Sequence, residues 1–397
     1  MSVYLDHAAT TPLRPEALQA LTETFGLVGN PSSIHTHGQN ARRLLEEARE
    51  TVAETLGCDP VEIIFTSGGT ESINLAIKGI YAARQALRPR PVIAVGQGEH
   101  HATSEAVEFL QSAHGARPQW LPLDSDGRIV DYDIEKPDET ALVTFLAVNN
   151  EVGTVQAVAD HAVPARSGGV PVHVDAVAAY GHIPVSLGGW GVDAISVSAH
   201  KIGGPVGIGA LAVTRTLSVV PLLHGGGQQR RVRSGTQDVA AAVAFAAAAR
   251  AAELERQAEN KRLSALRDRL VAGVRAAIPE AVLSGPPISS DDRVATIVHF
   301  VFPGAQGDSL LFLLDLDGFS VSTGSACTAG IPEPSHVIRA MHRSEADARS
   351  ALRFSMGRTT TTEDIDALVA ALPHAYARAR QAGLSERAPR HGGAATA

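Results

Sequence analysis

The 397-residue sequence contains little cysteine, few aromatic residues and no long apolar run. Its two cysteines, Cys58 and Cys327, cannot form the disulfide framework that stabilises many small secreted proteins. No segment approaches the ~18 consecutive apolar residues that predict a membrane span. The first residues, MSVYLDHAATTP, lack the basic and apolar stretches of a secretory signal. These absences predict a soluble, reduced, cytoplasmic protein with no membrane partner.

An excess of positive charge is also lacking. The 34 Lys and Arg residues stand against 42 Asp and Glu residues, so the formal net charge is -8. Nucleic-acid-binding proteins usually carry a basic patch, and this balance therefore argues against direct nucleic-acid binding. Arg230, Arg231 and Arg233 form one local basic cluster, which we expect at a dimer interface or near a phosphate group.

The composition and the pattern of short apolar runs predict an α/β protein. A hydrophobic content of 44% excludes a mainly disordered chain, and the length predicts two or three domains. Near-continuous apolar strands separated by helices predict a mostly parallel sheet covered on both faces. Ligands bind such sheets at the carboxyl ends of the strands. The predicted strands are 61–66, 91–95, 141–148, 170–174 and 194–197, and the predicted helices are 71–87 and 102–114.

A long helix rich in Ala, Arg and Glu is predicted from 239 to about 278. At ~1.5 Å rise per residue, it is long enough to connect two domains. Strand signals at 295–301 and 353–355, with a helix at 362–372, indicate a smaller α/β domain after it. The residues from 381 onward are polar and aperiodic, and they predict a disordered tail.

A glycine-rich turn, SGGTE, lies between the first predicted strand and the helix that follows it. Such a turn exposes backbone N–H groups, and the helix dipole favours an anion such as phosphate there. Thr70 adds a hydroxyl donor. The alternative is an ordinary strand-to-helix turn that is capped by Thr70 or Ser67.

Two charged residues follow other buried strands. Asp175 is costly at a strand end unless it caps the next turn or meets a cation, such as a protonated ring nitrogen of a ligand. Lys201, within SAHKIGGP, is either a surface lysine or a partly desolvated amine suited to Schiff-base chemistry. The phosphate turn, the aspartate and the lysine together form the set that pyridoxal 5'-phosphate (PLP) requires.

A cysteine and an arginine complete the candidate set. Cys327 lies in STGSACTAG, where the small polar neighbours suit an accessible, reactive thiol, whereas Cys58 fits an inert packing role. Arg353 interrupts an apolar strand and therefore needs an anion. That anion is either a substrate carboxylate or a carboxylate of the protein itself.

These ordered motifs resemble those of the cysteine desulfurases, in the NifS/IscS-like subgroup of the class V aminotransferase family. The matching segments include YLDHAATTP (4–12), FTSGGTES (65–72), HVDA (173–176), SAHKIGGP (198–205), GSACTAG (324–330) and RFSMGR (353–358). The resemblance implies a fold-type I PLP-dependent transferase, with a mostly parallel seven-stranded sheet in a large domain and a smaller α/β domain. It places the large PLP-binding domain at 15–255, the small domain with the catalytic cysteine loop at 1–14 and 256–380, and a disordered tail at 381–397.

The resemblance also implies roles for individual residues. Lys201 would bind PLP covalently and move protons at the substrate Cα, Asp175 would pair with the pyridine N–H, and His100 would stack on the ring and assist proton transfer. Arg353 and Asn150 would hold the substrate carboxylate, and no metal ion is expected. The other expected cofactor contacts are Gly69, Thr70, Asn150, Ser198, His200 and, across a homodimer, Thr236.

The implied reaction converts L-cysteine to L-alanine and transfers the sulfur to Cys327 as a persulfide, then to an acceptor protein. Acceptors in this family serve iron–sulfur cluster assembly, tRNA thiolation or DNA phosphorothioation. The sequence departs from the family at Ala178, where a glutamine usually contacts the cofactor ring, and at Val206, usually a lysine. Another class V activity, such as selenocysteine lyase or aminotransferase, and a scaffold without activity are the alternatives.

Overall fold

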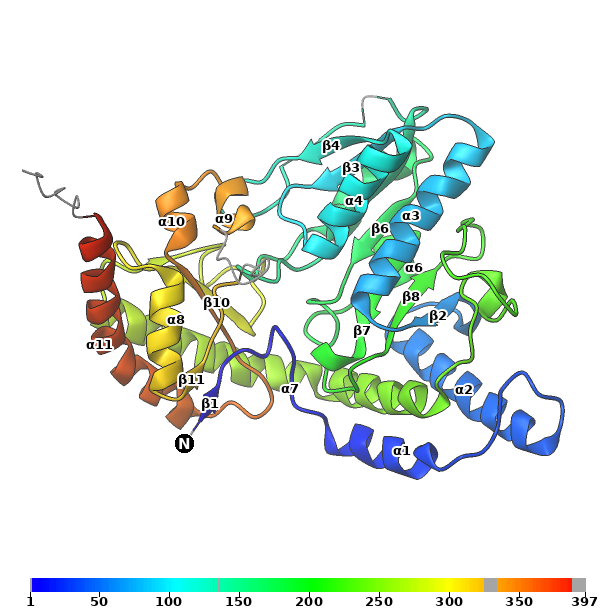
Figure 1. The fold of residues 1–397 in the computed structure, drawn as a ribbon, viewed down its shortest axis with the longest axis horizontal. Coiled ribbons are helices and arrows are strands. Elements are labelled where there is room, and N and C mark those ends of the chain that lie inside the picture. The colour runs from blue at the N-terminus through cyan, green and yellow to red at the C-terminus, as the bar shows by residue number, and fades with distance from the viewer. Residues whose placement is uncertain (1, 131, 135, 325–333, 388–397) are drawn as a thin grey trace, which may run out of the picture.

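The computed structural model describes residues 2–130, 132–134, 136–324 and 334–387. Its ribbon has two lobes that are joined along one long helix (Figure 1). The larger lobe contains a seven-stranded sheet with the strand order β2-β8-β7-β6-β5-β3-β4. Its strands are β2 (Ile63–Thr66), β3 (Val92–Gly96), β4 (Arg117–Leu121), β5 (Thr140–Leu146), β6 (Val172–Asp175), β7 (Ala194–Ser198) and β8 (Gly209–Val213).

The predicted mostly parallel α/β sheet is confirmed. Strand β8 runs antiparallel to both of its neighbours, and every other pair in the sheet is parallel. Two strands of this sheet, β4 and β8, were not predicted from the sequence. Strand β8 (GALAV) consists mainly of small residues, and β4 begins with Arg117 and Pro118, so neither shows the β-branched run by which the others were predicted.

Helices cover both faces of the sheet. Successive strand residues point to opposite faces, so Phe65 and Val143 join one core whereas Ile64 and Leu142 join another. The first core packs under α2, α5 and the first half of α7, and the second packs under α3 and α4. The helices of this lobe are α1 (Pro15–Phe25), α2 (Thr36–Thr55), α3 (Gly69–Leu87), α4 (His101–His114), α5 (Val158–Ser167) and α6 (Leu187–Trp190), with short 3-10 turns η1 (Pro60–Glu62), η2 (Ala199–Lys201) and η3 (Gln229–Arg231).

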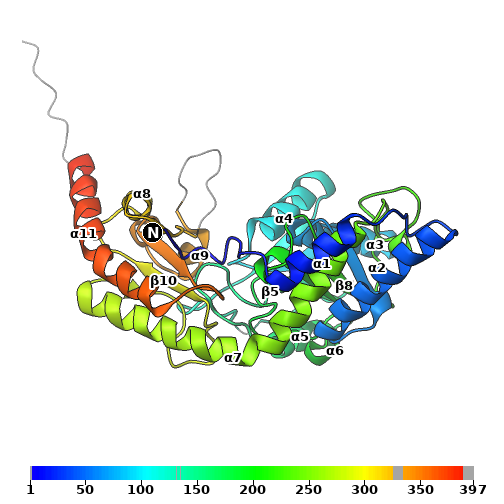
Figure 2. The ribbon, with the colours of Figure 1, turned by 90° about the horizontal axis from the view of Figure 1, so that it is seen from below.

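Helix α7 (Val239–Ala277) confirms the predicted long connecting helix and takes part in two cores. Ala242 and Phe245 pack into the core under the large sheet, whereas Leu263 and Leu270 pack into a separate core of the smaller lobe. Figure 2 shows α7 running beneath both lobes. The large and small cores are therefore joined by one continuous element, whose Ala-rich half allows close packing against α1 and α2.

The smaller lobe is built from both ends of the chain. Its antiparallel sheet has the order β12-β10-β9, and β1 pairs in parallel with β11. Leu5 from the N-terminal segment is fully buried in the same core as Phe300 and Phe354. The elements are β1 (Val3–Tyr4), β9 (Val282–Leu283), β10 (Ile297–Val301), α8 (Gly307–Leu316), β11 (Phe319–Ser320), α9 (His336–Ala340), α10 (Glu345–Arg349), β12 (Ala351–Ser355) and α11 (Thr362–Arg387). The exact domain boundaries stay a prediction.

Helix α11 corrects one boundary. The predicted disordered tail begins at residue 381, but α11 continues to Arg387. Residues 381–387 (QAGLSER) contain good helix formers and no proline, and a single glycine costs only about 1 kcal/mol relative to alanine. Residues 388–397 lie outside the described part of the chain. Within the described residues, no helix is long and apolar enough to cross a membrane.

Gly209 on β8 positions the turn between β2 and α3, and we predict that Gly209→Ala disturbs it. An added Cβ would lie 2.6 Å from the carbonyl oxygen of Val197 and 2.8 Å from the Cα of Gly68, both backbone atoms. We expect a loss of about 1–3 kcal/mol in the free energy of unfolding, measured by urea denaturation. Gly26→Ala is the control, because its Cβ meets nothing within 4 Å. Equal stability of the two variants would contradict this prediction.

Candidate active site

A cavity of about 410 Å³ opens at the carboxyl ends of the central strands, where the sequence predicts a ligand site. Nine of the eleven predicted site residues line it, although they come from both lobes of the chain. Thr236 does not line this cavity, and Cys327 lies outside the described residues. The nine are Gly69, Thr70, His100, Asn150, Asp175, Ser198, His200, Lys201 and Arg353.

Lys201 lies just after β7, at the end of the short η2 turn. Its Nζ donates hydrogen bonds to the carbonyl oxygens of Ala8 and Ala9, at 2.6 and 2.9 Å. Burial of the ammonium group, together with the charge of Arg353, lowers the pKa of Lys201 to about 8, whereas Asp175 and Asp6 act in the opposite direction. The amine is therefore partly neutral, and nucleophilic, close to physiological pH.

Asp175 ends β6 and lies deep in the cavity wall. One carboxylate oxygen accepts a hydrogen bond from the backbone N–H of Val177 at 2.9 Å. Burial raises the pKa of Asp175 to about 6, although that hydrogen bond and Lys201 favour the ionised form. A cationic group of a ligand would complete the charge balance here.

A cluster of imidazoles lines another side of the cavity. His100 caps α4: its Nδ1 accepts a hydrogen bond from the backbone N–H of Ala102 at 3.0 Å, so any ring proton is on Nε2. Partial burial, aided by the charge of Lys201, lowers the pKa of His100 to about 4, so the ring is neutral at physiological pH. The rings of His101 and His336 are in contact, with centroids 5.0 Å apart. The sequence analysis did not identify these two histidines.

The turn before α3 forms a pocket for an anion. Gly68 precedes the helix with φ of 152°, and no side chain caps the first N–H groups of α3. A Cβ on Gly69 would lie 2.8 Å from a methyl group of Val177, so the backbone approaches closely there. The hydroxyl of Ser198 faces this turn and is buried, with no hydrogen-bond partner in the part of the chain that the structure describes. An unpaired buried hydroxyl beside an uncapped helix N-terminus is what an anionic ligand group would satisfy.

Arg353 lies on β12 with its guanidinium at the cavity. Its Nη2 contacts the Asp6 carboxylate at 2.8 Å, and its Nη1 donates to the carbonyl oxygen of Asn150 at 2.8 Å. Its Nε is buried and has no partner among the described residues. The sequence predicts that Arg353 meets either a substrate carboxylate or a carboxylate of the protein. The ion pair with Asp6 shows that a carboxylate of the protein is present. The unpaired Nε leaves a donor for a ligand.

Cys327 lies outside the described residues. The described residues that flank it in the sequence, Ser322 and Gly324 before it and His336 after it, all line the cavity. Cys58 packs against the large core, where burial raises the pKa of its thiol to about 12. A thiol with such a pKa is a poor nucleophile, in agreement with the packing role predicted for Cys58.

Thr236 is exposed and does not line the cavity that contains the other nine residues. It lines a separate cavity of about 130 Å³ together with Ser67 and Arg233. Arg233 in turn pairs with Glu71 of α3 at 2.9 Å. The single chain therefore does not bring Thr236 to the cavity around Lys201.

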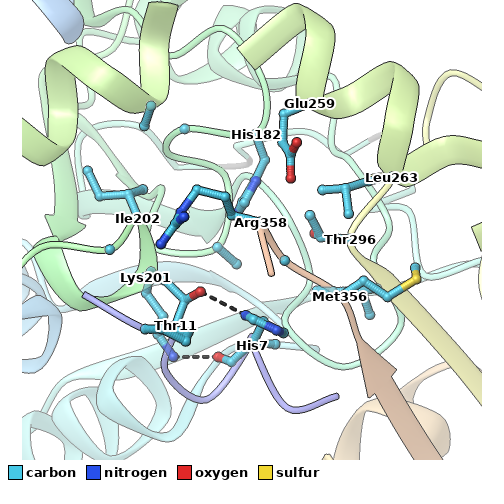
Figure 3. A pocket seen from close by; sticks show the side chains of 18 of the residues that line it. His7, Thr11, His182, Lys201, Ile202, Glu259, Leu263, Thr296, Met356 and Arg358 are labelled. Atoms are coloured by element: carbon cyan, nitrogen blue, oxygen red, sulfur yellow. Dashed lines mark hydrogen bonds between the residues drawn. The ribbon is translucent and has the colours of Figure 1, made fainter. Parts of the chain in front are cut away.

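A second, smaller cavity of about 60 Å³ lies on the other side of Lys201 (Figure 3). His7, Thr11 and His182 contribute polar groups to it, and Ala178 lines both cavities. The short side chain at position 178, where the family usually has glutamine, thus stands in the wall between the two spaces.

Comparisons with known proteins agree with this geometry. The family described as aminotransferase class-V matches residues 3–368. An IscS-like cysteine desulfurase of Mycobacterium tuberculosis is 49% identical over 96% of this chain and 98% of its own length. A solved NifS-like protein has a TM-score of 0.85 and 34% identity, covering 95% of this chain and 100% of that one. A structure described as SspA in complex with cysteine has a TM-score of 0.75 and 32% identity, covering 89% and 99%.

Both the extent and the identity of these matches are sufficient to assign the family. They span nearly the whole chain, including all nine residues that line the large cavity. The chain therefore belongs to the class-V aminotransferase family and, within it, to the PLP-dependent cysteine desulfurases of the IscS/NifS type.

Proposed function

We propose that this chain removes sulfur from L-cysteine, with Lys201 and Cys327 as its two reactive groups. The products are L-alanine and a persulfide on Cys327, which passes its sulfur to an acceptor protein. The observation that carries the proposal is the amine of Lys201, with a pKa of about 8, in a cavity that also presents Asp175 and an anion pocket. This combination of groups suits PLP.

The residues present fit PLP at three points. The uncapped start of α3 and the unpaired hydroxyl of Ser198 match a phosphate group. Buried Asp175 matches a protonated pyridine nitrogen, because no cationic side chain among the described residues forms an ion pair with its carboxylate. Lys201 supplies the amine that binds the aldehyde carbon. We assign Gly69, Thr70, Ser198 and His200 to the phosphate, His100 to the ring face and Asn150 to the neighbouring wall.

When bound, PLP supplies an electron sink that stabilises negative charge at the substrate Cα. The chain supplies the proton transfers and the orientation. Lys201, once its amine is free and neutral, takes the Cα proton, since its pKa of about 8 lies close to the operating pH. His100, neutral in this pH range, offers a second group for proton transfer next to the ring.

Arg353 binds the substrate carboxylate. Its guanidinium is nearly inaccessible to water, with a side-chain exposure of 6%, so an ionic hydrogen bond there is stronger than at the surface. The unpaired Nε provides a donor for the carboxylate, and Asn150 lines the cavity beside it. A fixed carboxylate directs the rest of the amino acid toward Lys201 and the segment that contains Cys327.

Cys327 accepts the sulfur. It follows Gly324, which lines the cavity, by three residues in the sequence. The thiolate attacks the substrate sulfur, the C–S bond breaks as the S–S bond forms, and the carbon that loses sulfur takes up a proton. The other cysteine, Cys58, is partly buried against the large core, and its raised pKa keeps it from competing for the sulfur.

We further propose a homodimer in the cytoplasm. Thr236 is exposed and does not line its own chain's cavity, as expected of a residue that contacts the cofactor of a second copy. Val206 (79% exposed) and Leu223 (46%) also present apolar surface on the loops after β7 and β8. The acceptor is a protein that collects persulfide sulfur, and the relatives that support this activity are named cysteine desulfurase.

Replacing the proposed sulfur acceptor separates this activity from other class V reactions. We expect Cys327→Ser to bind PLP normally but to lose alanine and sulfide formation by roughly three orders of magnitude or more, as for other covalent nucleophiles. Cys58→Ser is the control and keeps the activity. Mass spectrometry after incubation with labelled L-cysteine checks the persulfide. Full turnover by Cys327→Ser would instead indicate another activity of the family.

Removing the hydroxyl of Ser198 has opposite effects on the free protein and on cofactor binding. We expect Ser198→Ala to stabilise the cofactor-free protein by about 1 kcal/mol, since a buried unsatisfied donor is removed. PLP affinity should fall about tenfold, as measured by equilibrium dialysis.

Ser196→Ala is the matched control on the same strand. Its hydroxyl is buried but hydrogen-bonded to His173 at 2.8 Å, so its loss should destabilise the free protein and leave PLP affinity unchanged. The phosphate assignment is wrong if Ser198→Ala keeps full PLP affinity.

A further inference from the structure

The N-terminal residues 6–11, here called the 6–11 segment, contact both ends of the candidate active site. Asp6 pairs with Arg353, across 347 positions in the sequence, and both side chains are largely buried. Two residues further along, the carbonyl oxygens of Ala8 and Ala9 accept both hydrogen bonds of the Lys201 amine. One short segment thus touches the proposed substrate-binding arginine and the proposed cofactor-binding lysine.

The 6–11 segment is fixed to the strand that carries Arg353. Ser355 of β12 donates its backbone N–H to the carbonyl oxygen of Leu5 at 2.7 Å, and its hydroxyl accepts from the backbone N–H of Ala8 at 2.8 Å. His7 is buried, and its Nδ1 lies 2.7 Å from the hydroxyl of Thr11 (Figure 3). These contacts fix the carbonyl groups of the segment relative to β12.

The same segment also contacts the turn that carries Lys201. The hydroxyl of Thr10 lies 3.2 Å from Nδ1 of His200, and the backbone N–H of Thr11 donates to the carbonyl oxygen of His200. Figure 3 shows the Lys201 side chain directed at this segment, with a hydrogen bond to a main-chain oxygen. The lysine, which belongs to the large lobe, is therefore aligned with a strand of the small lobe through residues 6–11.

Carbonyl groups are suited to hold an amine that has no other bond. They accept hydrogen bonds from either protonation state, but the ammonium form offers three donors and is favoured. The nearby carboxylate of Asp6 raises the pKa of Lys201, in opposition to burial and Arg353. The charged groups that shift the pKa of the amine are Arg353, Asp175 and Asp6. His100 and His200 also face it, and the charge of Lys201 lowers the pKa of both rings.

We propose that the 6–11 segment is a positioning device: Asp6 orients Arg353 for the substrate carboxylate, and the carbonyl groups of Ala8 and Ala9 receive the Lys201 amine whenever it is not bound to the cofactor. The segment thereby fixes the distance between the carboxylate site and the amine. This inference rests on the proposed function for its substrate, but its lysine end is testable without turnover.

Two substitutions at Asp6 separate charge from orientation. Asp6→Asn keeps an oxygen that can accept from Nη2 of Arg353 but removes the negative charge. We expect the KM for L-cysteine to stay within about twofold of the wild type, since a single neutral hydrogen bond is retained. Asp6→Ala removes the acceptor, and we expect a several-fold rise in KM with a smaller change in kcat. An unchanged KM in Asp6→Ala would overturn the orienting role.

The lysine end is tested on the cofactor-free protein. Covalent attachment of PLP to Lys201, trapped with borohydride and mapped by mass spectrometry, is followed against pH. Attachment needs the neutral amine, so the wild type should reach half of its maximal rate near pH 8. Asp6→Asn should shift this midpoint to lower pH, because the carboxylate that favours the ammonium form is gone.

Glu255→Gln is the matched control. Glu255 pairs with Arg14 at 2.7 Å, just beyond the segment, and has no contact with Arg353 or Lys201 among the described residues. Its loss loosens the same stretch of chain without changing the charge at the amine, so the midpoint should stay at the wild-type value. An equal shift in both variants, or no shift in Asp6→Asn, would overturn the inference.

These outcomes are distinct from failure of the proposed function. If the wild type bound PLP at Lys201 but produced no alanine from L-cysteine, the desulfurase proposal would fail. The shift of the attachment midpoint in Asp6→Asn would still support the role of the segment at Lys201, and its absence would still refute that role.

Discussion

The arrangement of this site depends on keeping one amine away from bulk water. Burial lowers the pKa of Lys201 to about 8, and the cavity that achieves this is closed by the large sheet on one side and by the small lobe on the other. Both lobes contribute charged groups that act on the amine, because Asp175 belongs to the large sheet and Arg353 belongs to β12 of the small lobe. The continuous helix α7 packs into both cores and thereby fixes the position of one lobe relative to the other.

Much of this architecture follows from local sequence. The buried strands, the long helix and the residues at strand ends, such as Asp175 and Lys201, were predicted because a parallel sheet forces ligand-binding groups to one edge. The roles of His100 and Asn150 came only from the family resemblance, yet the cavity contains both. Strand β8 was missed because its small residues carry little β signal, although Gly209 at its start is what lets the chain approach Gly68.

The contacts that the sequence analysis missed are those between distant parts of the chain. The YLDHAATTP segment was recognised as a motif, but nothing in it shows that Asp6 meets Arg353 or that its carbonyl groups meet Lys201. Such contacts depend on β1 pairing with β11 and on Leu5 entering the small core, neither of which has a local signal. Thr236 is a different case, because its proposed function requires a second chain.

A second buried carboxyl group, that of Glu99, lies near Asp175 and affects the total negative charge at this end of the cavity. Glu99 is buried, and its Oε1 accepts a hydrogen bond from the backbone N–H of Leu146 at 3.0 Å. Burial raises the pKa of Glu99 well above its ordinary value, and the proximity of Asp175 adds to the effect. Two buried carboxyl groups that repel each other favour a state in which only one is ionised, and the direction of the shift favours the neutral form of Glu99. Asp175 then presents one negative charge, which a single protonated ring nitrogen can balance.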